Sequence, residues 1–319
     1  MRIVSLLPAA TEIVGALGLL DQLVGISHEC DYPPAVSALP RVTHCPIHNA
    51  GLSSAEVDAW VRSSLAEHGT LYHLDEALLR ALKPDLILTQ KLCDVCAVGY
   101  GSVARLAAQL PGPPLVLNLE PLHLSDVWND ITRIAEVCSV PERGRKVTAA
   151  MRQRVVSLSQ RWQNAGVTPR RCVLLEWADP PFCAGHWMPE VVALAGGHDP
   201  LGRSGQPSAR IAWDRVVAAQ PQVLLLSLCG YTAQRAREDL PLLQEQPGWE
   251  SLPAVQEGRV FLLDANAYYS RPGPRLVDAL EMTAGALHPA LFPEFQPTCF
   301  GDERILAVQT PSLVTQVTS

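Results

Sequence analysis

The sequence lacks an apolar run long enough to cross a membrane. A membrane-spanning helix takes about 18–20 consecutive apolar residues, and no run in this chain reaches that length. The sequence also lacks an excess of positive charge, because its formal net charge at pH 7 is −7. We therefore expect neither a membrane-spanning protein nor a nucleic-acid partner.

The N-terminus lacks the pattern of a secretory signal, which is a basic segment, an apolar stretch and a small-residue cleavage site. Residues "MRIVSLLPAATE" instead predict a strand from Ile3 to Leu7, a turn at Pro8 and a helix opened by Glu12 that stops near Gly18. We expect a cytoplasmic protein, or a periplasmic or membrane-anchored one if the true start lies upstream. The nine cysteines are then expected to be reduced thiols.

Common catalytic motifs are missing as well. The chain has no G-x-S-x-G, no H-E-x-x-H, and no G-x-G-x-x-G that opens a helix. The Gly/Ser loop "GRSGQPS", residues 202–208, lacks the strand–loop–helix frame and the lysine of a phosphate-binding loop. We therefore do not expect an enzyme.

What the sequence does contain predicts an α/β protein with two lobes. Hydrophobic residues make up 48% of its 319 residues, enough for two cores. Short apolar runs such as "PDLILTQ" and "PLVLNL" alternate with helical periods, which is typical of mainly parallel sheets covered by helices on both faces. A second series of the same kind begins at "RCVLLEW" and includes "PQVLLLSL" and "GRVFLLD".

A long helix separates the two series. Apolar residues recur at steps of three and four from Val147 to Trp162, which predicts a helix from Glu142 to Ala165, about 36 Å long. We expect it to join the lobes rigidly. The predicted parts are an N-terminal lobe, a connection that contains the helix, a C-terminal lobe and a tail: 1–124, 125–166, 167–298 and 299–319.

Polar, thiol and aromatic residues gather after the predicted strands of both lobes. Ligands of open α/β sheets bind beyond the carboxyl ends of the strands, so these residues are candidates for a cleft between the lobes. The candidates are His28, Cys30, Asp31, Tyr32, Cys93, Asp94, Cys96, Glu176, Trp177, Trp187, Cys229, Tyr268, Tyr269 and Arg271. Glu176 is either a carboxylate with a raised pKa or a hydrogen-bond partner of the ligand, and Arg271 either pairs with the ligand or lies on the surface.

Several segments resemble a known family. "RIVSLLPAATEIVGALGLLDQLVGISHECDYP", "LRALKPDLILTQ", "EWADPPFCAGHWMPEVVALAGG" and "YYSRPGPRLVDALE" match, in order, the substrate-binding proteins of metal-chelate ABC importers. The chain is similar to the class with one rigid helix between two α/β lobes, and within it to the cobalamin-binding branch. The resemblance extends to about Pro293.

The resemblance implies a corrinoid that lies flat in the cleft against aromatic side chains. The candidate walls are Tyr32, Trp177, Trp187, Tyr268 and Tyr269, because a broad macrocycle offers a large apolar face for stacking. The alternative for each of them is ordinary packing in the core. A chain without a signal peptide would deliver, store or sense its ligand in the cytoplasm.

The resemblance also implies docking to a permease through a glutamate on each lobe. Glu76 in "LDEALLRALKPD" matches the first position, and the second falls on Ser270, which has no carboxylate. The missing signal and Ser270 both weaken the expectation of transport and leave the expectation of binding intact.

The cysteines allow a second hypothesis, a metalloprotein that is possibly an enzyme. His28, Cys30, Cys93 and Cys96 follow two strands of one lobe, Gly25–Ser27 and Leu86–Thr89, and three thiolates with an imidazole suit zinc. Three thiolates equally suit an iron–sulfur cluster, and a thiolate or His28 is able to ligate the cobalt of a corrinoid. Small cysteines that fill turns are the plain alternative. "THCPIH", with His44, Cys45 and His48, is a weaker metal candidate, and Cys138 and Cys172 are expected to lie in the core.

Overall fold

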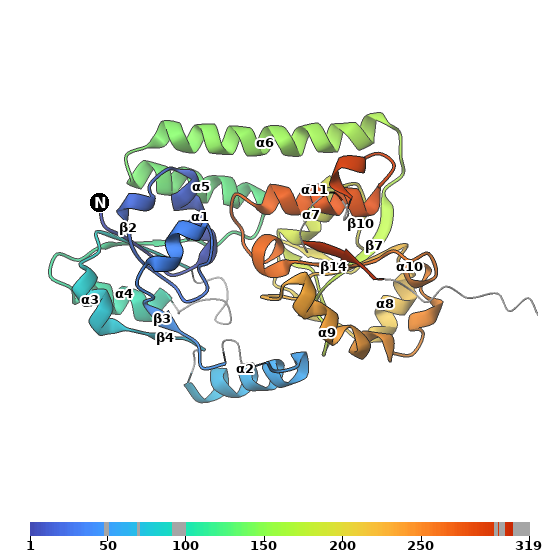
Figure 1. Cartoon of the computed structure of the whole chain (residues 1–319), viewed down its shortest axis with the longest axis horizontal. Helices are drawn as coiled ribbons and strands as arrows, with labels where there is room; N and C mark the ends of the chain where they lie inside the picture. The colour runs from blue at the N-terminus through green and yellow to red at the C-terminus, as the bar shows by residue number, and fades with distance from the viewer. Residues whose placement is uncertain (48–50, 69–70, 91–99, 297–298, 300–303, 309–319) are drawn as a thin grey trace, which may run out of the picture. The chain divides into compact units, whose positions relative to one another are not determined.

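The computed structural model describes residues 1–47, 51–68, 71–90, 100–296, 299 and 304–308. The chain divides into two units, each with its own sheet (Figure 1). Unit 1 comprises Met1–Ser157 and Arg271–Val277, and unit 2 comprises Leu158–Ser270 and Asp278–Ser319. The chain therefore enters unit 1 a second time, after most of unit 2, through the seven residues Arg271–Val277. The lobe boundaries expected from the sequence stay a prediction.

The sheet of unit 1 is parallel, as the continuous apolar runs predict. Its strand order is β2-β1-β5-β6, and its strands are β1 (Ile3–Ser5), β2 (Leu23–Ile26), β5 (Leu86–Thr89) and β6 (Leu115–Asn118). Every residue of β1 and β5 is buried, which fits a central position with helices on both faces. Because β1 lies between β2 and β5, the carboxyl ends of those two strands are not direct neighbours.

Helices cover both faces of this sheet. The helices are α1 (Pro8–Ala16), α2 (Ser54–His68), α3 (Glu76–Leu82), α4 (Tyr100–Ala108) and α5 (Leu124–Val137), with short 3₁₀ turns η1 (Leu20–Gln22) and η2 (Pro34–Ala38). Leucine and valine side chains of α3 and α4 pack on one face, and Figure 1 shows α1 and α5 on the other. A Cβ on Gly25 of β2 would come within 2.6 Å of the end of the Leu82 side chain, so α3 packs closely against β2 at this glycine.

The first helix begins earlier than the sequence predicts. The predicted start at Glu12 is wrong, because α1 begins at Pro8, whose fixed φ and missing N–H suit the first turn of a helix. Glu12 therefore lies inside the helix, 3% exposed. The predicted stop near Gly18 is confirmed: the helix ends at Ala16 and Gly18 has a positive φ.

The long helix is present as α6 (Pro141–Asn164), within one residue of its predicted bounds at each end. Met151, Val155 and Leu158, which carry the predicted apolar stripe, are all buried. The boundary between the units falls inside this helix, after Ser157. No helix in the described part of the chain is long and apolar enough to cross a membrane.

Unit 2 has a mixed sheet whose centre is parallel. The strand order is β12-β8-β7-β13-β14-β15, and β10 also pairs with β7. The strands of unit 2 are β7 (Arg170–Trp177), β8 (Phe182–Cys183), β9 (Gly185–His186), β10 (Gly197–His198), β11 (Arg203–Ser204), β12 (Ala209–Arg210), β13 (Val223–Leu226), β14 (Val260–Leu263) and β15 (Ile305–Ala307). Strands β7, β13 and β14 are parallel neighbours, and β8, β12 and β15 are antiparallel to the strands beside them.

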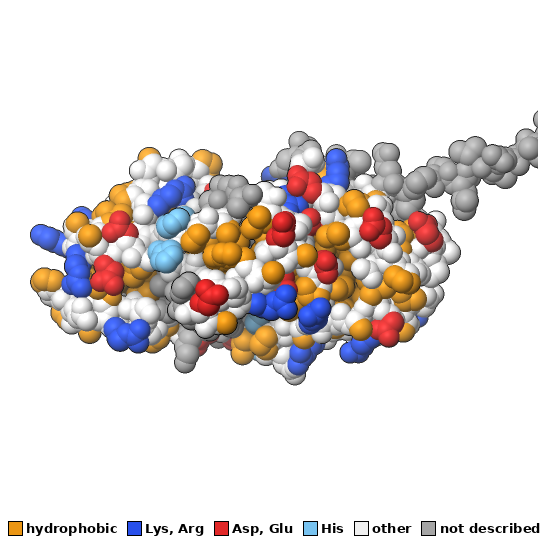
Figure 2. Space-filling model, turned by 90° about the horizontal axis from the view of Figure 1, so that it is seen from below, with side chains coloured by type: hydrophobic (Ala, Val, Ile, Leu, Met, Phe, Trp, Pro, Cys, Tyr) orange, Lys and Arg blue, Asp and Glu red, His pale blue; other side chains and the backbone are white. Residues whose placement is uncertain are grey.

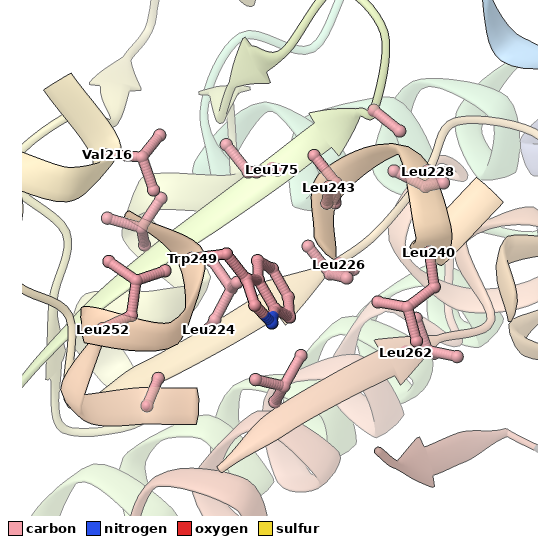
Figure 3. Packing of buried hydrophobic residues seen from close by; sticks show 14 of the residues in the cluster. Leu175, Val216, Leu224, Leu226, Leu228, Leu240, Leu243, Trp249, Leu252 and Leu262 are labelled. Carbon is pink, nitrogen blue, oxygen red and sulfur yellow. The ribbon is translucent and has the colours of Figure 1, made fainter. Parts of the chain in front are cut away.

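The helices of unit 2 complete its core. They are α7 (Met188–Leu194), α8 (Trp213–Ala219), α9 (Ala233–Gln244), α10 (Pro253–Gln256) and α11 (Leu276–Leu287), with short turns η3 (Trp249–Ser251), η4 (Ala265–Tyr269) and η5 (Pro293–Phe295). Figure 3 shows Trp249 among leucines of β13, β14 and α9. Each leucine buried in this way contributes about 1.5–3 kcal/mol to folding.

Both predicted features of the fold class, mainly parallel sheets with flanking helices and a long helix, are confirmed. The sequence does not predict the short strands of unit 2, which are only two residues long. Part of the expected tail, residues 299–319, also belongs to the sheet, since β15 pairs with β14. A small antiparallel pair, β3 (Thr43–His44) with β4 (His73–Leu74), lies outside the main sheet of unit 1.

Candidate functional site

The segment that follows β2 carries the largest group of predicted site residues. Arg41 holds it in place by donating hydrogen bonds to the backbone oxygens of Ser27, His28 and Cys30, at 3.2, 2.7 and 3.2 Å. A charged donor on three carbonyls fixes the loop without a regular element. The backbone positions of residues 27–30 are therefore set by an arginine beyond the loop.

His28 packs against the β3–β4 pair. Its Nδ1 lies 2.8 Å from the hydroxyl of Thr43, its Nε2 lies 3.2 Å from Glu29, and its ring is 5.3 Å from the ring of Tyr72. Burial disfavours the charged imidazole, but hydrogen bonds with Cys45 and Glu29 outweigh burial and raise the pKa of His28 to about 9. The imidazole therefore carries its proton at neutral pH, and a metal ion would have to displace that proton to bind the ring.

Cys30 is a core residue. Its side chain is fully buried, and its sulfur lies 3.0 Å from the hydroxyl of Thr11 and 3.2 Å from that of Ser27. Burial raises the pKa of this thiol, which disfavours the thiolate that binds metal. This geometry supports the plain interpretation of Cys30 as a small residue that fills a turn.

The predicted metal centre gains no support from the described residues. They include no group of three or more His, Cys, Asp or Glu side chains arranged to hold a metal ion. Cys93, Asp94 and Cys96 lie outside the described residues, as does His48. Cys138 and Cys172 are buried, as predicted.

Asp31, whose side chain is 54% exposed, and the buried Arg271 join one ionic network in unit 1. Arg271, 4% exposed, binds Asp31 through two hydrogen bonds of 2.5 and 3.1 Å and also reaches Glu12 at 3.3 Å. Burial disfavours its charge, but the interactions with Asp31 and Glu12 outweigh burial, so the pKa of Arg271 lies above its ordinary value. The surface interpretation of Arg271 is wrong.

Tyr32 is an exposed aromatic ring beside this network. The residue is 42% exposed, and the guanidinium of Arg275 lies 4.0 Å from the centre of its ring. Arg275 in turn donates to both carboxylate oxygens of Glu12, at 2.9 and 2.6 Å. We name Tyr32, Arg275 and Glu12 the Tyr32 platform. In it the guanidinium of Arg275 lies over the ring of an exposed tyrosine.

Glu176 closes the end of β7 in unit 2. Its carboxylate accepts hydrogen bonds from the backbone N–H of Gly185, at 3.0 Å, and from the hydroxyl of Ser208. A Cβ on Gly185 would lie 2.2 Å from the backbone nitrogen of Ser208, so only glycine allows these segments to meet. Burial raises the pKa of Glu176 to about 7, against these hydrogen bonds, which lower it. The predicted perturbed carboxylate is therefore present, and it ties two loops together.

Trp177 follows directly and heads a second aromatic group. Its ring lies 5.2 Å from that of Tyr231, and the guanidinium of Arg235 lies 4.3 Å from the centre of the Tyr231 ring. Arg235 is held by Asp239, which is 3% exposed, at 3.2 Å. We name Trp177, Tyr231, Arg235 and Asp239 the Trp177 platform.

Cys229 lies beside the Trp177 platform. Its backbone N–H donates to the carbonyl of Glu176 at 2.9 Å, and the residue is exposed. The structure therefore brings Glu176, Trp177 and Cys229 together at the carboxyl edge of the sheet of unit 2, as the sequence predicts.

The other three aromatic candidates of unit 2 are more deeply placed. Trp187 and Tyr268 are each 7% exposed, and Trp187 donates from its indole nitrogen to the backbone oxygen of Tyr269 at 3.1 Å. Tyr269 is 1% exposed, and its hydroxyl lies 3.2 Å from both Ala279 and Thr283 of α11. This position supports core packing for Tyr269.

Sequence reasoning missed the side chains that hold the candidates in place. Arg275 and Ser208 gave no signal, because each acts through a contact that only the fold creates. The step of four from Arg235 to Asp239 marks one face of α9, and this pair was open to recognition from the sequence.

Acidic and basic side chains are interspersed on the face drawn in Figure 2, and neither sign forms a large continuous patch among the residues described there.

Comparisons with known proteins agree with the fold. The profile of the periplasmic binding protein family matches residues 3–267. The vitamin B12-binding protein of Vibrio cholerae serotype O1 is 30% identical over 285 residues, which cover 88% of this chain and 86% of that protein. That of Yersinia pseudotuberculosis serotype O:3 is 29% identical over 230 residues, 71% of this chain and 69% of that protein.

Solved structures show the same likeness. The periplasmic vitamin B12-binding protein of Vibrio cholerae has a TM-score of 0.65 at 27% identity and covers 91% of this chain and 97% of its own. A periplasmic heme-binding protein of Roseiflexus sp. RS-1 has a TM-score of 0.68 at 23% identity, covering 91% and 98%, and shares the fold alone. These relatives are binding proteins described as periplasmic, so the prediction of a cytoplasmic location has no support in them. The chain belongs to the periplasmic binding protein family.

Proposed function

We propose that the chain binds a cobalamin-like corrinoid and serves as the substrate-binding protein of an importer. One observation carries the proposal: the likeness to the Vibrio cholerae vitamin B12-binding protein extends over 88% of this chain. The likeness to heme-binding proteins lies at or below 23% identity in the structures compared, and therefore supports the fold and not a ligand.

The two platforms supply the surfaces that such a ligand needs. A corrinoid is a broad ring system with a large apolar face, which aromatic side chains recognise by stacking. Tyr32, after β2, and Trp177, at the end of β7, each lie at the carboxyl edge of a sheet, where ligands of open α/β sheets bind. A shared cleft for them stays a prediction.

Titration with cyanocobalamin tests the proposal directly. We expect one corrinoid per chain, measured by equilibrium dialysis and by the change in the absorption spectrum of the corrin ring. Hemin, titrated under the same conditions, is expected to bind at least tenfold more weakly, which corresponds to a difference of about 1.4 kcal/mol. Preference for hemin, or no binding of cyanocobalamin, would refute the ligand assignment.

Paired substitutions locate the binding surface. Tyr32→Ala and Trp177→Ala are each expected to weaken binding by about tenfold or more, since burial and stacking of one aromatic ring contribute about 1–3 kcal/mol. Tyr32→Phe keeps the ring and is expected to bind as the unchanged protein does. Trp162→Ala is the control for Trp177. The indole nitrogen of Trp162 donates to the backbone oxygen of Leu194, and its ring lies beside Gly196. The backbone oxygen of Gly196 accepts a hydrogen bond from Arg170 at the amino end of β7, whereas Trp177 lies at the carboxyl end. Equal losses in Trp162→Ala and Trp177→Ala would contradict the placement.

Docking to a permease is the second part of the proposal, and it rests on Glu76. Glu76 begins α3, and its side chain is 64% exposed, with Arg80 3.7 Å away. It is accessible to a partner, whereas Ser270 has only a hydroxyl at the second matching position. We expect Glu76→Ala to leave corrinoid affinity unchanged and to weaken retention on membrane vesicles that contain a cobalamin permease.

A further inference from the structure

We propose that Arg275 and Glu12 are positioning residues that hold the ring of Tyr32 ready to receive a flat ligand. The proposal rests on the function proposed above and names the part of unit 1 that determines affinity. Neither residue is one of the aromatic walls, and neither needs to touch the ligand.

The geometry of the carboxylate fixes the arginine. Both oxygens of Glu12 accept hydrogen bonds from Arg275, one from Nε and one from Nη2, so the plane of the guanidinium is set as well as its position. The side chain of Glu12 is 2% exposed and lies inside α1, so the anchor is buried and belongs to a helix. An arginine tied in this way has little freedom to leave the tyrosine ring.

A second arginine fixes the backbone beside the same tyrosine. Arg271 shares Glu12 with Arg275 and binds Asp31, the neighbour of Tyr32 in the chain, through both oxygens of that carboxylate. It also donates to the backbone oxygen of Glu29 at 3.3 Å. Tyr32 is therefore restrained twice: through Asp31 at the backbone and through Arg275 at the ring.

This restraint is needed because Tyr32 is otherwise exposed. A ring that is 42% exposed is able to change rotamer, and its ordering would oppose binding. The guanidinium 4.0 Å from the ring centre covers one face and leaves a stacking surface of set orientation. Preorganisation of this kind raises affinity without any new contact to the ligand.

A double-mutant cycle with cyanocobalamin tests the proposal. Arg275→Met keeps much of the side-chain length and removes the planar cation, and we expect it to weaken binding by about three- to tenfold. In a Tyr32→Ala background the same substitution is expected to change affinity less than twofold. Arg152→Met, an exposed residue of α6 in unit 1, is the matched control and is expected to bind normally. Equal losses with and without Tyr32, or no loss in Arg275→Met, would overturn the proposal.

Arg275→Lys separates positioning from folding. Lysine keeps an ion pair with Glu12, so we expect the unfolding midpoint to stay close to that of the unchanged protein, but it cannot hold both oxygens and stack as a plane. Corrinoid affinity is therefore expected to remain reduced at least twofold. Full affinity in Arg275→Lys would overturn the role of the planar guanidinium.

A measurement without ligand keeps this test independent of the proposed function. With 3-fluorotyrosine in place of tyrosine, the ¹⁹F signal of Tyr32 is assigned from Tyr32→Phe. We expect that signal to shift and broaden in Arg275→Met and to stay unchanged in Arg152→Met. An unchanged signal in Arg275→Met would overturn the positioning role. Failure of the unchanged protein to bind cyanocobalamin, with the signal shifted, would overturn the proposed function alone.

Discussion

The Tyr32 platform and the Trp177 platform are built from the same parts in different ways. Each has an aromatic ring, an arginine and a buried carboxylate, Glu12 at 2% and Asp239 at 5% side-chain exposure. In unit 1, Arg275 lies 263 residues from Glu12 along the chain, and its guanidinium lies directly over the ring of Tyr32. In unit 2 both charged groups lie on α9, and Tyr231 stands between the arginine and Trp177.

The difference shows which platform depends on the global fold. Arg235 and Asp239 are four residues apart on one helix, so that pair forms whenever α9 forms. The pair of Arg275 and Glu12 forms only when residues 271–277 return to unit 1. We therefore expect changes in the Tyr32 platform to affect both stability and affinity, and changes in the Trp177 platform to have milder, local effects.

Removal of the buried carboxylates is expected to give the largest contrast. Glu12→Ala leaves the buried Arg271 and the partly buried Arg275 without their shared partner. Breaking a buried ion pair destabilises a protein by about 3–5 kcal/mol. Asp239→Ala affects one arginine, whose side chain is 23% exposed, so we expect about 1–2 kcal/mol. Urea unfolding of both variants, followed by fluorescence, measures the difference. An equal loss in the two variants would remove the distinction between the platforms.

Glu176, which precedes Trp177 in the chain, is expected to make the stability of unit 2 depend on pH. The pKa of Glu176 is raised from 4.5 to about 7, so its contribution is fully present below pH 4.5 and is lost as pH rises through about 7. Glu176→Gln keeps an acceptor for Gly185 and should be more stable than the unchanged protein at pH 8, by about 2 kcal/mol. The two proteins should be alike at pH 4.5.

Thermal unfolding across pH 4.5–8 measures this contrast. Glu257→Gln, an exposed glutamate of the same unit, controls for the loss of one charge. Parallel pH curves for Glu176→Gln and the unchanged protein would show that Glu176 titrates outside this range.

A corresponding but smaller dependence is expected in unit 1 from His28. Its pKa is raised from 6.5 to about 9, so its stabilisation is present below pH 6.5 and is lost as pH rises through about 9. The free energy of unfolding of the unchanged protein should fall between pH 6.5 and 9. His28→Asn keeps a polar group near Thr43, and in this variant the fall should be smaller by about 1 kcal/mol. His44→Asn is the control, because His44 is exposed and stacks on His73. The same pH curve in His28→Asn and the unchanged protein would contradict the prediction.

Much of the fold follows from local patterns in the sequence. Buried runs such as Leu86–Thr89 and Val223–Leu226 predict parallel strands, because they are continuous and apolar except for Thr89 at the end of the first. The spacing of Met151, Val155 and Leu158 predicts α6. The start of α1 was missed because Glu12, a charged residue, suggests an exposed first turn, whereas it is buried by two arginines that lie more than 250 residues later.

The sequence predicted where the candidate residues lie, at the carboxyl ends of the strands, but not which contacts their side chains make. Residues after the strands, among them Asp31, Tyr32, Glu176 and Trp177, do lie at the carboxyl edges of the sheets. What each side chain does there depends on partners supplied by the fold. Arg271 illustrates this limit, since its sequence context beside Pro272 suits a surface turn, and only the return of residues 271–277 buries it against Asp31.

The smallest expected effect concerns the arginine of the Trp177 platform. Arg235 rests on Tyr231 and reaches Trp177 only through that ring, so Arg235→Met is expected to change corrinoid affinity less than twofold. Arg275→Met is expected to weaken binding by about three- to tenfold under the same conditions. Equilibrium dialysis of both variants gives the ratio. Tyr231→Ala, which removes the intermediate ring, is expected to lie between them. If Arg235→Met weakens binding as much as Arg275→Met, an arginine acts equally well through a second ring, and direct stacking is not what distinguishes the two platforms.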